Sequence, residues 1–213
     1  NKPINRFKII DNNEASNNQD KSEQLLLLKE RVNSIENCIL KDNSKNLIMG
    51  DGNIEGPIMF IGEAPGQTED NLGLSFQGDV GVLLNKMLKA INIDIKKVYL
   101  SYSINFRPPE DRKPTTSEIK RYSVFLKEHI SIIDPKIIIL FGSTAMESVT
   151  HSNERISNER GKWKEIILKN KTYPIMVTFN PSYLIRFPGN KKFSWEDLKK
   201  IKQKILDLKI KIS

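Results

Sequence analysis

Apolar residues recur along this chain with two spacings, and the change of spacing divides it into expected helices and strands. Residues 22–40 carry Leu, Val and Ile at every third or fourth position, which predicts an amphipathic helix. The same helical spacing recurs at residues 81–91, 115–130 and 194–208, and residues 142–144 have the composition of a turn and N-cap that lead into a short helix. Thr115 and Glu118 have the spacing of a capping box before one of these segments. Ser194 and Asp197 are the expected cap of the last one.

Short uninterrupted apolar runs predict buried strands between these helices. They lie at residues 57–61, 98–104, 136–141 and 172–179. Strands that alternate with helices predict an α/β fold with a mostly parallel sheet of about four strands, covered by helices. Ligands of such sheets bind beyond the carboxyl ends of the strands. We therefore expect the loops that follow residues 61 and 179 to meet in space.

The domain organisation follows from length and polarity. The 213 residues are enough for one domain with a sizeable core and few for two. Residues 1–22 are rich in Asn, Asp, Lys and Ser and predict a flexible N-terminal tail, whereas residues 23–213 predict the folded domain. No run approaches the ~20 apolar residues that span a bilayer, and the start lacks the apolar segment of a secretory signal. We expect a monomer in the bacterial cytoplasm, with no membrane partner.

The charge balance is basic, with 34 Lys and Arg against 26 Asp and Glu and a net charge of +8. This excess is compatible with a polyanionic partner such as a nucleic acid. It is equally compatible with a Lys-rich and Ile-rich composition bias, because the basic residues are spread along the chain. Charge alone leaves both interpretations open.

Metal and disulfide chemistry are strongly limited. Cys38 is the only cysteine, so neither an intrachain disulfide nor a site with four cysteine ligands can form. His129 and His151 do not have metal-ligand spacing. We expect no metal, and Cys38 to be a small buried apolar residue.

Two loops have the composition of ligand-binding segments. Residues 62–70 read GEAPGQTED, in which the glycines allow close approach of the backbone to a ligand and Pro65 stiffens the turn. Neither a phosphate-binding Gly-Lys-Ser/Thr sequence nor Gly-x-Gly-x-x-Gly is present. Residues 180–186 read NPSYLIR, and apolar residues beside an arginine suit a loop that enters a DNA duplex. Either loop alone is also compatible with an ordinary turn.

The order of the motifs IMFIGEAPGQTED, SFQG, RPPEDRKPT, KIIILFGSTA, RGKW and TFNPSYLIR resembles that of the family 4 uracil-DNA glycosylases. The resemblance extends from about residue 38 to residue 205. It implies a three-layer α/β/α sandwich with a mostly parallel four-stranded sheet. It also implies a DNA repair enzyme whose partner is DNA containing uracil or a related deaminated base. Such an enzyme flips the base out of the stack and hydrolyses its N-glycosidic bond.

The resemblance gives candidate roles to individual residues. Glu63 is the catalytic candidate that positions a water near the sugar, and Asn180 is the candidate donor to the leaving base. The residues implied for the base pocket are Ala64, Gly66, Phe76 and Tyr102, with Phe76 stacking on the base. The residues implied to contact DNA are Arg107, Arg112, Lys113, Arg160, Ser182, Leu184 and Arg186, with Leu184 as the wedge.

The family often has an iron–sulfur cluster held by four cysteines, and this chain departs from that pattern. The four corresponding positions hold Ile35, Cys38, Phe106 and Tyr122. Only one cysteine remains, so we expect no cofactor. Apolar and aromatic packing is expected to take the place of the cluster.

Two further departures concern the base. Tyr102 stands where the family usually has an asparagine that reads the uracil edge, and a tyrosine offers one hydroxyl and more bulk. Asn105 lies nearby but is expected to face the other way. Asn180 stands where the family usually has a histidine, and its amide can donate a hydrogen bond but carries no positive charge.

Three hypotheses follow. The first is an active glycosylase on uracil or a related deaminated base. The second, motivated by Tyr102 and Asn180, is a non-catalytic or specificity-shifted member that binds DNA without cutting it. The third is a small-molecule α/β enzyme that shares only the loops.

Overall fold

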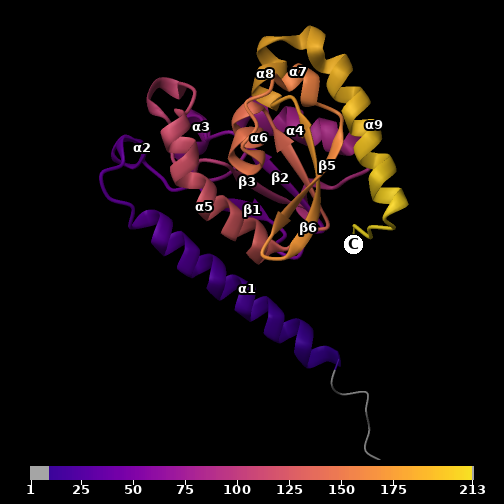
Figure 1. Ribbon diagram of the computed structural model, residues 1–213, viewed down its shortest axis with the longest axis horizontal. Coiled ribbons are helices and arrows are strands. Elements are labelled where there is room, and N and C mark those ends of the chain that lie inside the picture. The colour runs from indigo at the N-terminus through magenta and orange to yellow at the C-terminus, as the bar shows by residue number, and fades with distance from the viewer. Residues whose placement is uncertain (1–9, 213) are drawn as a thin grey trace, which may run out of the picture.

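The computed structural model describes residues 10–212, with side chains from residue 21 onward. A six-stranded sheet in the order β1-β3-β2-β4-β6-β5 forms its centre (Figure 1). The strands are β1 (Gly50–Gly52), β2 (Ile58–Gly62), β3 (Tyr99–Tyr102), β4 (Ile137–Phe141), β5 (Trp163–Leu168) and β6 (Lys171–Thr178). Strands β3, β2, β4 and β6 are parallel, whereas β1 and β5 pair antiparallel at the two edges. The predicted parallel four-stranded sheet is confirmed, and an antiparallel strand extends it at each edge.

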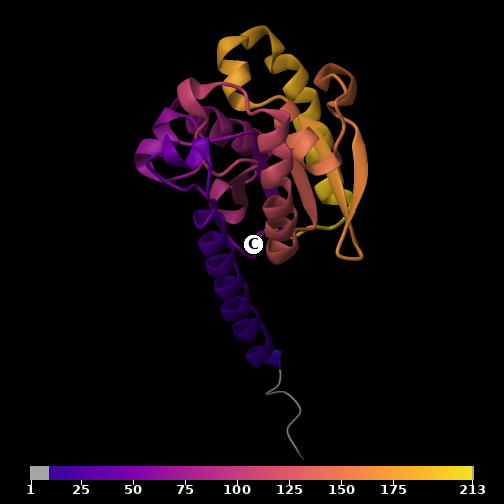
Figure 2. The ribbon, with the colours of Figure 1, turned by 60° about the vertical axis from the view of Figure 1, so that its left-hand side comes forward.

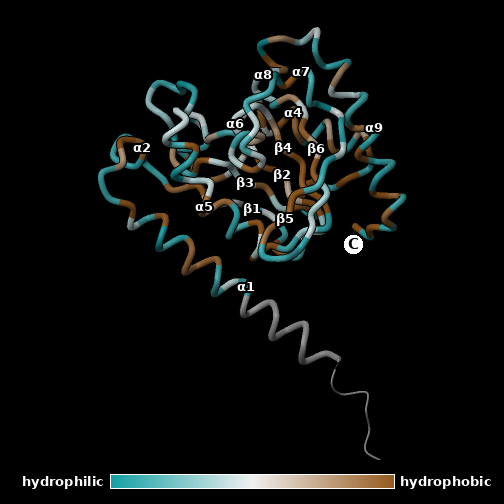
Figure 3. Tube along the Cα trace, viewed as in Figure 1, coloured by the Kyte–Doolittle hydropathy of each residue, from teal (hydrophilic) through white to brown (hydrophobic). Residues whose placement is uncertain are grey.

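Helices cover both faces of the sheet. They are α1 (Ile10–Asn33), α2 (Ile39–Asp42), α3 (Gln67–Leu72), α4 (Gly78–Ala90), α5 (Thr116–Ile133), α6 (Ser143–Thr150), α7 (Ile156–Glu159), α8 (Pro181–Arg186) and α9 (Lys191–Asp207). On one face, Phe60 of the sheet shares a buried cluster with Leu84 of α4 and Ile201 of α9. On the other face, Ile138 clusters with Ile130 of α5. The expected three-layer α/β/α sandwich is confirmed, with the most hydrophobic segments in its middle layer (Figure 3).

Strand β5 and its hairpin with β6 were not among the predicted elements. The strand lies at the sheet edge, and its residues are exposed or half-buried without a regular alternation, so its apolar signal is weak. Lys169 and Asn170 form the turn with φ of 44° and 64°. Two consecutive positive φ values are typical of a type I′ hairpin turn, which usually contains a glycine. The absence of glycine at this turn explains why the sequence pattern did not indicate it.

The N-terminal helix differs from its prediction at both ends. Helix α1 spans Ile10–Asn33 instead of residues 22–40, and a non-helical segment separates it from the short helix α2. The tail predicted for residues 1–22 is therefore helical from Ile10 onward, and residues 1–9 lie outside the described residues. Figure 2 shows α1 projecting from the sandwich. Within residues 10–212, no helix combines the length and apolarity needed to cross a membrane.

The two predicted helix caps have opposite outcomes. The capping box of α5 is confirmed, because Thr115 Oγ1 accepts from Glu118 N at 3.3 Å and the Glu118 carboxylate accepts from Thr115 N at 2.7 Å. The predicted cap of α9 is wrong. This helix begins at Lys191, so Ser194 and Asp197 lie buried inside it. Asp197 instead takes part in a buried ion pair described below.

A buried histidine on α5 predicts a pH-dependent stability. His129 is buried, and one ring nitrogen lies 3.0 Å from the Tyr99 hydroxyl. Burial lowers the pKa of His129 from 6.5 to about 4. Between pH ~4 and pH ~6.5 the unfolded chain binds a proton on this histidine that the native protein excludes. The contribution of His129 to stability is therefore fully present above pH ~6.5 and is lost as the pH falls toward ~4. From pH ~7 to pH ~4.5 we expect this group to cost about 2 kcal/mol.

Urea unfolding of the wild type and of His129→Gln at these two pH values measures the difference. The variant should lose less stability on acidification than the wild type. His151→Gln, at an exposed histidine, is the matched control and should follow the wild type. Equal acid sensitivity of His129→Gln and wild type would contradict the assignment.

Candidate active site

A pocket of about 790 Å³ opens at the carboxyl ends of the parallel strands. Four loops line it: residues 63–66 after β2, residues 108–114 after β3, residues 142–144 after β4 and residues 179–186 after β6. The two loops singled out in the sequence therefore meet at one site, as expected. The structure adds the loops after β3 and β4.

The carboxylate of Glu63 is the point where three of these loops join. Its Oε1 accepts from Thr144 N at 2.9 Å and from Ser143 Oγ at 3.4 Å. Its Oε2 accepts from Asn180 Nδ2 at 3.1 Å. Because Ser143 and Thr144 begin helix α6, the carboxylate also lies at the positive end of that helix. Glu63 is thus fixed in position and orientation on the pocket wall.

Gly142 provides the space that this carboxylate occupies. Its φ is +94°, and a Cβ added there would lie 2.4 Å from Glu63 Cδ. A larger residue would both strain the backbone and displace the carboxylate. Sequence reasoning identified residues 142–144 only as a turn and helix start. Their place after a buried strand, at the ligand-binding edge of the sheet, was the available signal for a role in the site.

Asn180 is held from both ends of its side-chain amide. Its Oδ1 accepts from Ser182 N at 3.1 Å and caps helix α8, while its Nδ2 donates to Glu63. The residue is 8% exposed. Its Nδ2 has a second N–H beyond the bond to Glu63, since an amide nitrogen carries two. That N–H is the donor that Asn180 can offer to a ligand in the pocket.

The predicted base-pocket residues do not all line the pocket. Ala64, Gly66 and Tyr102 line it, but Phe76 does not. Phe76 is only 4% exposed, and its ring stacks on Tyr102 with centroids 4.7 Å apart and planes at 19°. The expectation that Phe76 offers an open face to a base is therefore wrong for this conformation. Asn105 is also absent from the lining, and its amide donates to Ile48 O at 3.0 Å.

The comparison with known families bears directly on this site. A sequence model of the uracil DNA glycosylase superfamily matches residues 49–201, which include Glu63 and Asn180. The chain belongs to the uracil DNA glycosylase superfamily. The extent of this match contradicts the hypothesis of an unrelated small-molecule enzyme that shares only loops.

Several relatives from the superfamily are similar over most of their length. The type-4 uracil-DNA glycosylase of Thermotoga maritima is 34% identical over 185 residues, covering 85% of this chain and 95% of that protein. The type-4 uracil-DNA glycosylase of Sulfurisphaera tokodaii is 34% identical, covering 83% and 82%. That of Saccharolobus solfataricus is 32% identical, covering 85% and 86%.

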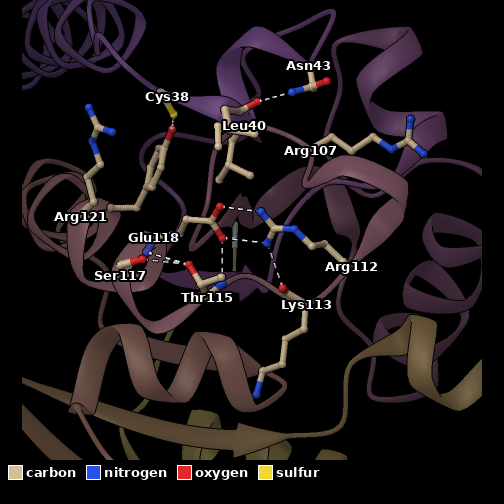
Figure 4. A network of polar contacts seen from close by, with 12 residues as sticks. Cys38, Leu40, Asn43, Arg107, Arg112, Lys113, Thr115, Ser117, Glu118 and Arg121 are labelled. Carbon is tan, nitrogen blue, oxygen red and sulfur yellow. Dashed lines mark hydrogen bonds and ion pairs between the residues drawn. The ribbon is translucent and has the colours of Figure 1, made fainter.

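Several cations predicted to contact DNA in this superfamily member line the pocket. Arg112, Lys113 and Arg186 line the pocket together with Ser182. Arg112 is paired with Glu118 through bonds of 2.7 and 2.9 Å, as Figure 4 shows. Exposed pairs of this kind contribute little stability, so a phosphate can replace the carboxylate at small cost.

Arg107 does not line the pocket itself. Its guanidinium binds the carboxylate of Asp111, which does line the pocket, at 2.7 and 3.1 Å. Figure 4 draws no contact between Arg107 and the network of Arg112. Arg107 therefore stays a candidate for a phosphate contact at the edge of the site.

The structure gives Arg160 a different role from the predicted DNA contact. Its guanidinium binds the carboxylate of Asp197 at 2.6 and 3.0 Å, and Asp197 is completely buried. It also lies over the rings of Phe179 and Phe193, at 5.5 and 5.2 Å from their centroids. Burial raises the pKa of Asp197, and Arg160 opposes this shift. Arg160 thus neutralises a buried charge and does not line the pocket.

Leu184 is not available as the wedge. It is 1% exposed and packs in the core beside α4, whereas its neighbour Ile185 is 40% exposed and lines the pocket. Helix α8 turns these adjacent side chains in different directions, and sequence alone could not tell which one faces the core. The exposed aliphatic residue next to Arg186 is therefore Ile185.

The four positions that correspond to the cysteines of an iron–sulfur cluster lie close together in this structure. Ile35, Cys38, Phe106 and Tyr122 do come together in one buried cluster. Cys38, labelled in Figure 4, has its Sγ 3.3 Å from the Tyr122 hydroxyl. The Phe106 and Tyr122 rings meet edge to face, with centroids 6.5 Å apart. One sulfur among aliphatic and aromatic side chains does not fit a cluster that needs four cysteine ligands. Among the described residues, no group of three or more His, Cys, Asp or Glu is placed to hold a metal ion.

Proposed function

We propose that this protein is a DNA glycosylase that captures an extruded uracil, or a related deaminated base, and hydrolyses its N-glycosidic bond. The observation that supports this most is the 3.1 Å hydrogen bond between Glu63 and Asn180 on the pocket wall. It brings together a carboxylate and an amide donor from loops 117 residues apart in the sequence. The relatives named as type-4 uracil-DNA glycosylases support the same activity.

Glu63 is proposed to act on the sugar side of the reaction. Breaking the bond between C1′ and the base nitrogen sends the electron pair to the base and leaves positive charge on the sugar. A carboxylate fixed by three donors can stabilise that positive charge without reorganising. It can also accept a proton from the water whose oxygen bonds to C1′.

Asn180 is proposed to act on the base side. Negative charge develops on the carbonyl oxygens of the leaving base, and the second N–H of Asn180 Nδ2 can donate to one of them. The bond from Ser182 N to Oδ1 keeps the amide in this orientation. Because the amide is neutral, we expect weaker stabilisation than a charged imidazole would supply.

The DNA backbone is proposed to run across the pocket mouth. Arg112, Lys113 and Arg186 line the pocket and can pair with phosphates. Ile185 is proposed as the apolar wedge, because it is exposed beside Arg186. We also propose that packing around Cys38 replaces the iron–sulfur cluster. A monomer and a bacterial cytoplasmic location stay predictions of the sequence.

A second candidate function, DNA binding without excision, is favoured by one observation. The face of Phe76 that a base would stack on is covered by Tyr102. Such a protein would bind DNA with an affinity that falls steeply as salt rises and would release no base. Filter binding over a salt series, run beside the activity assay, separates the two candidates.

The proposed activity is tested with oligonucleotides that contain uracil, hypoxanthine, xanthine or mismatched thymine. Each is offered to the purified protein as a single strand and as a duplex, and abasic sites are revealed by alkaline cleavage. We expect product from uracil or another deaminated base. No product from any substrate, from a protein that binds DNA, would reject the glycosylase and support the second candidate.

The duplex arm of this assay also tests the wedge. Unstacking a base step costs a few kcal/mol, which an inserted apolar side chain offsets. Ile185→Ala is therefore expected to slow duplex excision by roughly tenfold or more while sparing single strands. Val124→Ala, at an exposed position on α5, is the matched control. Equal slowing on both substrates would argue against a wedge at Ile185.

A further inference from the structure

The inner wall of the pocket is formed by a side chain that itself resembles a ligand. Tyr102 lines the pocket at the end of β3, yet it is only 4% exposed. Behind it lies Phe76, which the pocket does not reach. The Tyr102 ring therefore separates the open pocket from an aromatic face that is otherwise suited to a nucleobase.

The contacts of Tyr102 with Phe76 are those that a base would make. The two rings stack with centroids 4.7 Å apart and planes at 19°. The Tyr102 hydroxyl oxygen accepts from Phe76 N at 3.0 Å. A pyrimidine offers the same features, a flat six-membered ring that stacks on aromatic side chains and a carbonyl oxygen that accepts from N–H groups. The phenol of Tyr102 thus occupies both the stacking face of the Phe76 ring and the N–H donor of the Phe76 backbone.

The surroundings are shaped for two stacked rings. A Cβ added at Gly62 would lie 2.7 Å from the Tyr102 ring and 2.9 Å from the Phe76 ring. Phe76 has a φ of 50°, a left-handed conformation that is rare for aromatic residues. Its ring and that of Phe141 meet edge to face, with centroids 6.1 Å apart. Burial, and then the Glu69 carboxylate, raise the pKa of Tyr102 well above its usual value, so the hydroxyl stays protonated.

We propose that Tyr102 is a resident substitute for a nucleobase that closes the slot on Phe76, so that a pyrimidine stacks on Phe76 only after the tyrosine side chain has moved out. Displacing Tyr102 costs free energy, and this cost weakens the binding of every base that enters by the same amount. This inference rests on the proposed function. It makes the pocket a self-occluded version of a base-binding site.

The first test measures binding of free uracil by calorimetry, with no excision involved. Tyr102→Ala and Tyr102→Asn open the slot. Because the exposed Phe76 ring can then stack on the base, we expect these variants to bind uracil roughly tenfold or more tightly than the wild type. Tyr102→Phe keeps the ring and is expected to keep the slot closed. Folded Ala and Asn variants that bind uracil no more tightly than the wild type would overturn the proposal.

A second test uses the wild type, so that it stands even if the small variants fail to fold. Tetranitromethane nitrates accessible tyrosines, and mass spectrometry locates the modification. Tyr102 should be protected in the free protein and become modified when uracil-containing DNA is bound. Continued protection in the complex would overturn the proposal.

These readouts separate this inference from the proposed function. A wild type that excises no base, together with Tyr102→Ala that binds uracil tightly, would support the slot and reject the activity. A wild type that excises uracil, together with folded Tyr102→Ala and Tyr102→Asn variants that bind uracil no more tightly than the wild type, would support the activity and reject the slot.

Discussion

Replacing Glu63 by glutamine is expected to slow base excision by roughly 10²–10⁴-fold, the range for loss of a positioned acid–base group. Glutamine preserves the size of the side chain but removes the negative charge opposite the sugar. It also puts an NH₂ group against one of the donors, Thr144 N or Asn180 Nδ2, that now bind the carboxylate. Both changes act on the transition state more than on DNA binding.

Single-turnover excision with excess protein measures this loss separately from product release. DNA affinity should stay within a few-fold of the wild type, since Glu63 makes no proposed phosphate contact. Glu147→Gln, on the same helix α6 but outside the pocket lining, is the matched control and should keep its rate. Wild-type excision by Glu63→Gln would remove Glu63 from the mechanism.

Arg160→Ala is expected to lower the free energy of unfolding by about 3–5 kcal/mol, the usual cost of leaving a buried charge without its partner. Asp197 is 0% exposed, and its remaining side-chain partner is the Thr178 hydroxyl at 2.6 Å. Removing the guanidinium also removes its contacts with the Phe179 and Phe193 rings. The substitution is therefore expected to weaken the packing between β6 and α9 and so the stability of the fold.

Urea unfolding of Arg160→Ala and Arg112→Ala makes the comparison. Arg112 is paired with Glu118 on the surface, where side-chain exposures are 38% and 18%, and its loss should cost less than about 1 kcal/mol. If Arg160→Ala keeps its stability but loses DNA affinity and part of its salt dependence, the sequence-based role in phosphate binding is the right one.

The sequence predicts most of the fold because its central strands are buried on both faces. β2 and β4 are uninterrupted apolar runs with every residue buried, so periodicity and composition agree. β5 is an edge strand without a regular alternation of buried and exposed residues, and its turn uses Lys169 and Asn170 in place of glycine. Its pairing is decided by tertiary structure that the local pattern does not contain.

The candidate site was predictable where a residue's role depends on its loop, and unpredictable where it depends on a distant partner. Glu63 and Asn180 follow strands whose carboxyl ends must meet, so their convergence follows from the topology. The burial of Phe76 depends on Tyr102, 26 residues further along the chain. The role of Arg160 depends in the same way on Asp197, 37 residues further along.

The buried cluster that contains Ile35, Cys38, Phe106 and Tyr122 has a consequence for how this protein matures in the cell. Its four positions are joined by side-chain packing and one contact between a thiol and a phenol. Under the proposal that packing replaces the cluster, the chain can complete its fold as soon as it is synthesised. It then needs no iron delivery or sulfur donor, and oxygen has no inorganic centre to attack.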